Sequence, residues 1–117
     1  MLDLSANDLV TLPDDLSFFI SLEEFNLSSN QFNSESTLVK PESLFKALGT
    51  IPKLKRLNLS RNCFNRFHHD SLTQHSFRDL QELDFSYNMV EEEHGLLYIQ
   101  KFSNLLSVTI TGNPFAL

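Results

Sequence analysis

Residues 54–64 read LKRLNLSRNCF, with leucine at the first, fourth and sixth places, asparagine at the ninth and phenylalanine at the eleventh. The fourth and sixth places are two residues apart, which is the spacing of side chains on one face of a β-strand. We therefore expect a short strand whose leucines enter a core, followed by a turn that contains the asparagine.

Variants of this stretch occur along the whole chain. LEEFNLSSNQF begins at Leu22, LQELDFSYNMV at Leu80 and LLSVTITGNPF at Leu105, and a truncated copy, MLDLSANDL, begins at Met1. The ninth place is asparagine in every copy, and these asparagines follow one another at steps of 23, 32, 26 and 25 residues. The chain is therefore organised as five copies of one unit.

This pattern resembles the leucine-rich repeat, whose motif is L-x-x-L-x-L-x-x-N-x-L and whose length is about 20–29 residues. Strands that run in one direction and are joined by long return segments pair as a parallel sheet. The resemblance implies an α/β fold, a leucine-rich-repeat solenoid shaped as a horseshoe arc, with the parallel β-sheet on the concave face and helices or short turns on the convex face. We expect one domain over residues 1–117, with repeats at about 1–21, 22–53, 54–79, 80–104 and 105–117.

The ninth-place asparagine stands where the chain turns away from the strand. Its side-chain amide can donate to and accept from backbone groups that the turn leaves unpaired in the interior. We therefore predict a structural ladder of hydrogen bonds between repeats. Its members are Asn7, Asn30, Asn62, Asn88 and Asn113.

The return segments carry a second apolar column, three residues before the first leucine of a repeat. Its members are Phe19, Ile51, Phe77 and Phe102. The stretch PESLFKALG has proline at its start and glycine at its end, as helices often do. In VEEEHGLLYIQKFSNL, acidic residues stand where they favour a helix start. We expect helices behind the later repeats, with a further helix start at Asp70 and Ser71.

The longest step between asparagines contains an insertion at residues 34–40, SESTLVK. Surface loops carry both sequence variation and binding contacts. The insertion is therefore either a docking loop for a partner or a tolerated extension of the surface.

The composition of the chain argues against several classes of protein. Its formal net charge is −6, with 15 acidic and 9 basic residues, whereas a nucleic-acid surface needs clustered lysine and arginine. The sequence has no apolar run of about 18 residues and no signal-peptide pattern. The single cysteine, Cys63, favours a reducing compartment. We expect protein partners, and neither nucleic acid nor a membrane.

One group of residues has the composition of a zinc site. Cys63, His68, His69, Asp70 and His75 lie close in the sequence, but they lack the paired spacing of zinc ligands, and adjacent histidines diverge. The chain has only three glycines and no phosphate-binding, nucleophile-elbow or metalloprotease motif. We therefore predict no catalytic, cofactor or metal site, and we do not expect an enzyme.

A stacked sheet leaves one face open, and its side chains come from the third, fifth, seventh and eighth places of the motif. Arginine and tyrosine are enriched among residues that dominate binding energy, so the charged and aromatic residues on this face are the candidates. The predicted protein-binding residues of the concave face are Glu24, Arg56, Asn58, Arg61, Glu82, Asp84 and Tyr87. In the alternative interpretation, Arg56 and Glu82 only neutralise each other across neighbouring strands.

Function is therefore expected to come from binding. The sequence predicts a non-catalytic interaction scaffold or a subunit of a hetero-complex in the cytoplasm, in assemblies such as the cytoskeleton or the ciliary axoneme. The alternatives are the ligand-sensing part of a longer signalling protein or enzyme, and an extracellular receptor domain. The last repeat reads GNPFAL, without the cysteine that extracellular leucine-rich repeats commonly have there, which favours the intracellular type. Both ends interrupt a repeat, so we expect a longer chain or neighbours that cover them.

Overall fold

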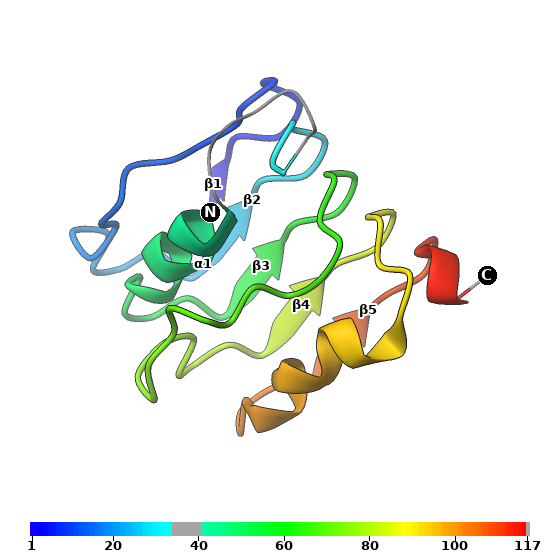
Figure 1. Cartoon of the computed structure of the whole chain (residues 1–117). Coiled ribbons are helices and arrows are strands. Elements are labelled where there is room, and N and C mark those ends of the chain that lie inside the picture. Colours follow the sequence, from blue (N-terminus) through cyan, green and yellow to red (C-terminus); the bar gives the residue numbers. More distant parts are fainter. Residues whose placement is uncertain (34–40, 117) are drawn as a thin grey trace.

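Five short parallel strands lie side by side in a computed structural model that describes residues 1–33 and 41–116 (Figure 1). Their order along the sheet is their order in the sequence, so each repeat contributes one strand and stacks on the repeat before it. The strands are β1 (Leu2–Asp3), β2 (Glu24–Asn26), β3 (Arg56–Asn58), β4 (Glu82–Asp84) and β5 (Ser107–Thr109). The predicted parallel sheet and α/β solenoid are confirmed, while the repeat boundaries stay a prediction.

The strands pair in the register that the motif predicts. Glu24 of β2 lies opposite Arg56 of β3, which in turn lies opposite Glu82 of β4, so equal places of the motif meet. The pairing continues beyond the strands, because the backbone N–H of Leu27 donates to the carbonyl of Asn58 at 2.9 Å. The side chains at one place of the motif therefore form columns across the sheet.

The return segments differ in their secondary structure. The predicted helix at PESLFKALG is confirmed as α1 (Pro41–Gly49), which covers the face of the sheet turned to the viewer in Figure 1, near β2. The second predicted helix forms as the 3₁₀ helix η1 (Glu93–Lys101), and a short 3₁₀ turn, η2 (Pro114–Ala116), follows β5. The step from Asn30 to Asn62 is 32 residues long and has room for an α-helix. The step from Asn88 to Asn113 has only 25 residues, and a 3₁₀ helix, which rises about 2.0 Å per residue, crosses the same distance with fewer residues.

The predicted helix start at Asp70 and Ser71 is wrong. This part of the chain forms isolated turns, such as the one closed by the Leu72 N–H on the His69 carbonyl at 3.0 Å. Phe77 has a φ of 55°, which is a left-handed conformation that ends any helical run before it. The third return segment therefore turns the chain without a helix.

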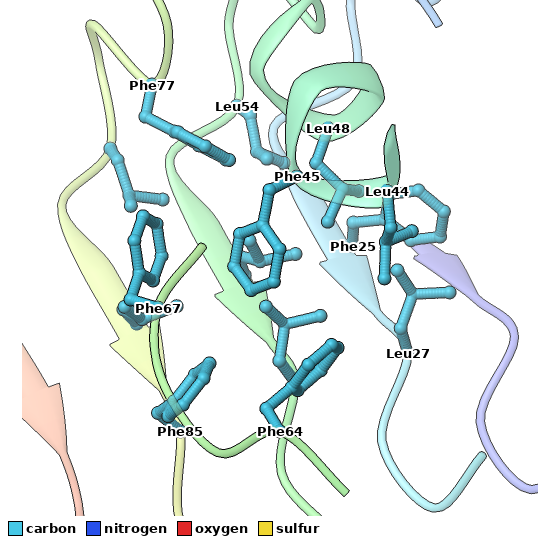
Figure 2. Packing of buried hydrophobic residues seen from close by; sticks show 14 of the residues in the cluster. Phe25, Leu27, Leu44, Phe45, Leu48, Leu54, Phe64, Phe67, Phe77 and Phe85 are labelled. Atoms are coloured by element: carbon cyan, nitrogen blue, oxygen red, sulfur yellow. The ribbon is translucent and has the colours of Figure 1, made fainter. Parts of the chain in front are cut away.

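The core lies between the sheet and the return segments. Figure 2 shows Phe45 of α1 among the phenylalanines of the neighbouring repeats, with ring centroids 5.1 Å from Phe64 and 4.7 Å from Phe67. In the second apolar column, Ile51 and Phe77 are buried, as predicted. The column's outer members, Phe19 and Phe102, are only partly buried because they belong to repeats near the two ends of the sheet.

The predicted insertion at residues 34–40 lies outside the described residues.

Candidate functional site

The open face of the sheet forms a shallow groove with a volume of about 310 Å³. Its walls come from the third and fifth places of the motif on successive strands. Five of the seven predicted binding residues line the groove, namely Glu24, Arg56, Asn58, Glu82 and Asp84. The other two predicted residues, Arg61 and Tyr87, lie outside the groove on the turns that follow β3 and β4.

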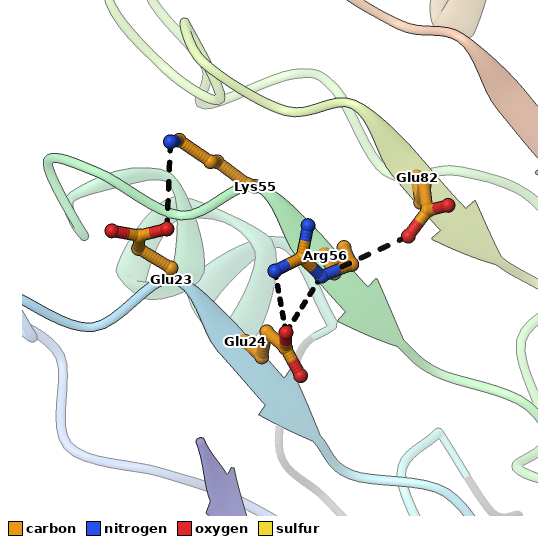
Figure 3. A network of polar contacts seen from close by, with 5 residues as sticks. All are labelled: Glu23, Glu24, Lys55, Arg56 and Glu82. Carbon is orange, nitrogen blue, oxygen red and sulfur yellow. Dashed lines mark hydrogen bonds and ion pairs between the residues drawn. The ribbon is translucent and has the colours of Figure 1, made fainter.

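Arg56 lies between two glutamates in the middle of the groove (Figure 3). Its Nε donates to Oε1 of Glu24 at 2.8 Å, and the same nitrogen lies 3.8 Å from Oε2 of Glu82. The hydrogen bond to Glu24 raises the pKa of Arg56 above its ordinary value. Arg56 is therefore held mainly by Glu24, and the contact with Glu82 named in the alternative interpretation is present but weaker.

The charge of the groove is unbalanced. Three carboxylates, those of Glu24, Glu82 and Asp84, line it together with the single guanidinium of Arg56. Arg56 is engaged by Glu24, so the side of the groove formed by β4 keeps two negative charges for an incoming group. The groove therefore suits donors and cations of a partner better than it suits anions.

The fifth-place side chains also stabilise the turns after the strands. The side-chain oxygen of Asn58 accepts the backbone N–H of Ser60 at 3.0 Å, and Asp84 does the same for Ser86. Asp3 and Asn26 make the equivalent bonds. This role was not predicted from the sequence, although the recurring Asp or Asn two residues before serine is a known signal for such a turn.

The asparagines at the ninth place join neighbouring repeats. In the buried Asn62, the side-chain nitrogen donates to the carbonyls of Leu27 and Leu59 at 3.1 Å each, and Oδ1 accepts the N–H of Phe32 at 3.3 Å. Asn30, Asn88 and Asn113 make corresponding contacts with the repeat before their own. The side-chain nitrogen of the exposed Asn7 donates within its own repeat, to the carbonyls of Leu4 and Ser5.

The eighth-place residues adopt a left-handed backbone conformation after each strand. Ala6, Ser29, Arg61 and Tyr87 have φ between 54° and 57°, and Gly112 has a φ of 81°. In this conformation the N–H of Arg61 donates to the carbonyl of Ser86 at 3.0 Å. The side chains of Arg61 and Tyr87 are exposed and stack, with the guanidinium carbon 4.3 Å from the ring centroid.

The histidines of the third return segment lie in different surroundings. His68 is buried against Phe45 and Phe64, whereas His69 is exposed and stacks on Tyr98 at 4.6 Å. Burial lowers the pKa of His68 to about 4. Within residues 1–33 and 41–116, no three histidine, cysteine, aspartate or glutamate side chains come together as metal ligands would.

In the part of the chain that the structure describes, no helix is long and apolar enough to cross a lipid bilayer.

Comparison with known families supports the repeat assignment. The family model described as Leucine Rich Repeat matches residues 21–46 and 53–75. The first segment contains β2 and the first six residues of α1, and the second contains β3 with turns that follow it. Comparison with curated proteins gave no significant match.

Proposed function

The chain is a leucine-rich-repeat protein, and from that premise we propose that it is a non-catalytic module that binds a protein partner on the open face of its sheet. The groove on this face carries the proposal. It is built from side chains of successive repeats, and its floor is a rigid ladder of backbone hydrogen bonds. Such a surface is pre-organised, so a partner loses little free energy in ordering it.

The groove favours an extended partner segment that carries basic groups. Glu82 is more than half exposed in its side chain and only loosely held by Arg56, so it is available to a cation from outside. Asp84 lies two residues further along β4 on the same face. Both of its hydrogen bonds from Ser86 use Oδ1, so Oδ2 remains available to a partner. A lysine or arginine of the partner would meet both carboxylates together.

We place this module in the cytoplasm, as a scaffold or a subunit of a hetero-complex in the cytoskeleton or a cilium. The support comes from sequence: the single cysteine, and a resemblance of ALGTIPKLKRLNLSRN and LPDDLSFFISL to repeats of the X-ray radiation resistance-associated protein. The alternative function is a ligand-sensing region of a longer signalling protein. Localisation of a tagged full-length protein in ciliated cells tests the placement.

A steric block tests the groove. Ser107 is an exposed third-place residue that lines the groove, and Ser107→Trp would fill part of it without removing any hydrogen bond of the described side chains. The matched control is Ser103→Trp, an exposed serine in the fourth return segment. Affinity capture with quantitative mass spectrometry should show that Ser107→Trp loses partners that the wild type and Ser103→Trp retain. Equal partner sets for both variants would contradict the proposal.

A further inference from the structure

Large apolar side chains that are exposed in the described residues gather mostly at the two ends of the sheet. Seven of the nine lie near one end or the other. Those near the first strand are Met1, Val10, Phe18 and Ile20, and those near the last strand are Leu97, Leu106 and Val108. The two others are Tyr87 and Met89, which are 47% and 52% exposed on the turn after β4. These two residues and Arg61 form what we call the loop-edge patch.

The position of Tyr87 is fixed by the repeat that follows. The ring lies against Gly112, where a Cβ atom would come within 2.6 Å of Cε1 of Tyr87. Glycine at the eighth place of the last repeat therefore makes the space that the ring occupies. Arg61 stacks on the same ring from the other neighbouring repeat, so the tyrosine is ordered from both sides while nearly half of it stays exposed.

The architecture of the repeats does not explain these side chains. Left-handed backbone is least costly for glycine and asparagine, and a larger residue there costs about 1 kcal/mol or more. The bond between repeats at this place uses only backbone atoms, as in the Tyr87 N–H donated to the carbonyl of Thr111 at 2.9 Å. Among the described residues, no hydrogen bond or ion pair involves the side chain of Arg61 or Tyr87. Tyrosine, arginine and methionine are the residue types that binding surfaces favour.

The charge of Arg61 indicates that the partner group is a carboxylate. Arg56 and Arg66 each donate to a carboxylate of the chain at 2.8 Å, those of Glu24 and Asp70. Arg61 has no such partner within residues 1–33 and 41–116, although the chain is rich in acids. A guanidinium that stacks on a ring keeps its N–H groups directed outward at the edge, where they suit a carboxylate.

We propose that the loop-edge patch docks a segment of a partner protein in which an aspartate or glutamate stands next to an apolar side chain. The carboxylate binds Arg61, and the apolar side chain packs on Tyr87 and Met89. This surface is separate from the groove and does not depend on it. The groove, with three carboxylates, would repel the same segment, so the two surfaces differ in their preference.

Synthetic peptides with the sequence Gly-Glu-Leu repeated four times provide the probe. Titration into the ¹⁵N-labelled 117-residue chain should give saturable NMR shifts at the Arg61 side-chain N–H and at the amides of Met89 and Gly112. The comparison peptides replace Glu by Lys, or Leu by Ser, and should bind the patch at least about tenfold more weakly.

Variants locate the binding. Arg61→Asn and Tyr87→Asn keep a residue that tolerates left-handed backbone, and each should weaken the Glu-Leu peptide about tenfold or more. The matched control, Arg78→Asn, removes an exposed arginine of the third return segment and should leave the affinity unchanged. If either patch variant unfolds, as judged by its urea midpoint, Met89→Ser replaces it.

Three results would overturn the proposal: no shifts at millimolar peptide, equal binding of the lysine peptide at the patch, or shifts centred on Glu82 and Ser107 in the groove. The last result would assign the peptide to the groove instead. If the Ser107→Trp experiment contradicts partner binding in the groove, the proposal for the loop-edge patch is unaffected.

Discussion

The side-chain nitrogen of Asn62 donates to the carbonyl of Leu27 in the preceding repeat and to that of Leu59 in its own repeat, at 3.1 Å in each case. Both acceptors belong to fully buried residues, and Asn62 itself is 7% exposed. One amide thus ties two repeats together in a place that water does not reach. Buried polar groups left without a partner cost about 1 to 3 kcal/mol.

Asn62→Ala should therefore lower the free energy of unfolding by about 1 to 3 kcal/mol, measured by urea denaturation. The matched control is Asn7→Ala, because the exposed side chain of Asn7 donates to carbonyls of its own repeat. Its loss should be clearly smaller. Equal losses for the two variants would show that the contact between repeats adds nothing to the local turn.

His68 should make the stability of the chain depend on pH. Burial lowers its pKa to about 4 from 6.5, so the unfolded chain takes up a proton first as the pH falls. Stability should be highest above pH 6.5, decline between pH 6.5 and 4, and level off below, with a total loss from this group of at most about 3 kcal/mol.

The charged groups near His68 modify this decline. Arg66 and His69 oppose its protonation, whereas Glu42 and Asp70 favour it. His68→Phe should flatten the stability profile between pH 4 and 6.5, and His75→Phe, at an exposed histidine, should not. Urea midpoints at four pH values suffice. A slope that persists in His68→Phe would assign the effect to the carboxylates.

Gly112→Ala should destabilise the last turn. Gly112 has a φ of 81°, and its new Cβ atom would meet the ring of Tyr87. We expect a loss of about 1 to 3 kcal/mol in thermal or urea unfolding. Repeating the substitution in a Tyr87→Asn background removes the collision and leaves the backbone strain. If the loss is the same in both backgrounds, the ring does not rest on this glycine.

Arg56→Glu should make the stability of the chain dependent on salt. Three carboxylates would then face one another in register on β2, β3 and β4, where like charges repel. The urea midpoint should fall at low ionic strength and recover partly in about 1 M salt, because exposed charges are screened. Arg78→Glu, away from the sheet, is the control for net charge. An equal fall in both variants would exclude the cross-strand effect.

The parallel sheet could be predicted from the sequence because the strand spacing and the recurring asparagine indicate the same repeat. Leu57 and Leu59 have strand spacing, and Asn62 recurs at nearly constant steps, so strand, register and ladder follow from one motif. The return segments were harder, because a helix at Asp70 and Ser71 is allowed by local composition. Phe77 has a φ of 55°, which ends any helical run before it, and phenylalanine is not a residue type that signals a left-handed conformation.

The predicted binding residues do not all lie on one surface, for a similar reason. Arg56 and Arg61 are five residues apart and were assigned to one face, but the chain turns between them, so Arg56 lines the groove and Arg61 lies outside it on the turn after β3. The burial of His68 was also missed, since adjacent histidines in a polar stretch resemble a surface loop. Its environment depends on Phe45, which arrives from another repeat.

At the eighth place of a repeat, the backbone and the side chain have different roles. Its backbone holds the neighbouring repeat, and its side chain leaves the array, as the series alanine, serine, arginine, tyrosine and glycine shows. Substitutions there can alter what the surface recognises while the assembly that supports it is conserved. In the first four repeats this column can therefore change its side chains and keep the backbone bond between repeats, whereas the glycine of the last repeat has no room for a side chain beside Tyr87.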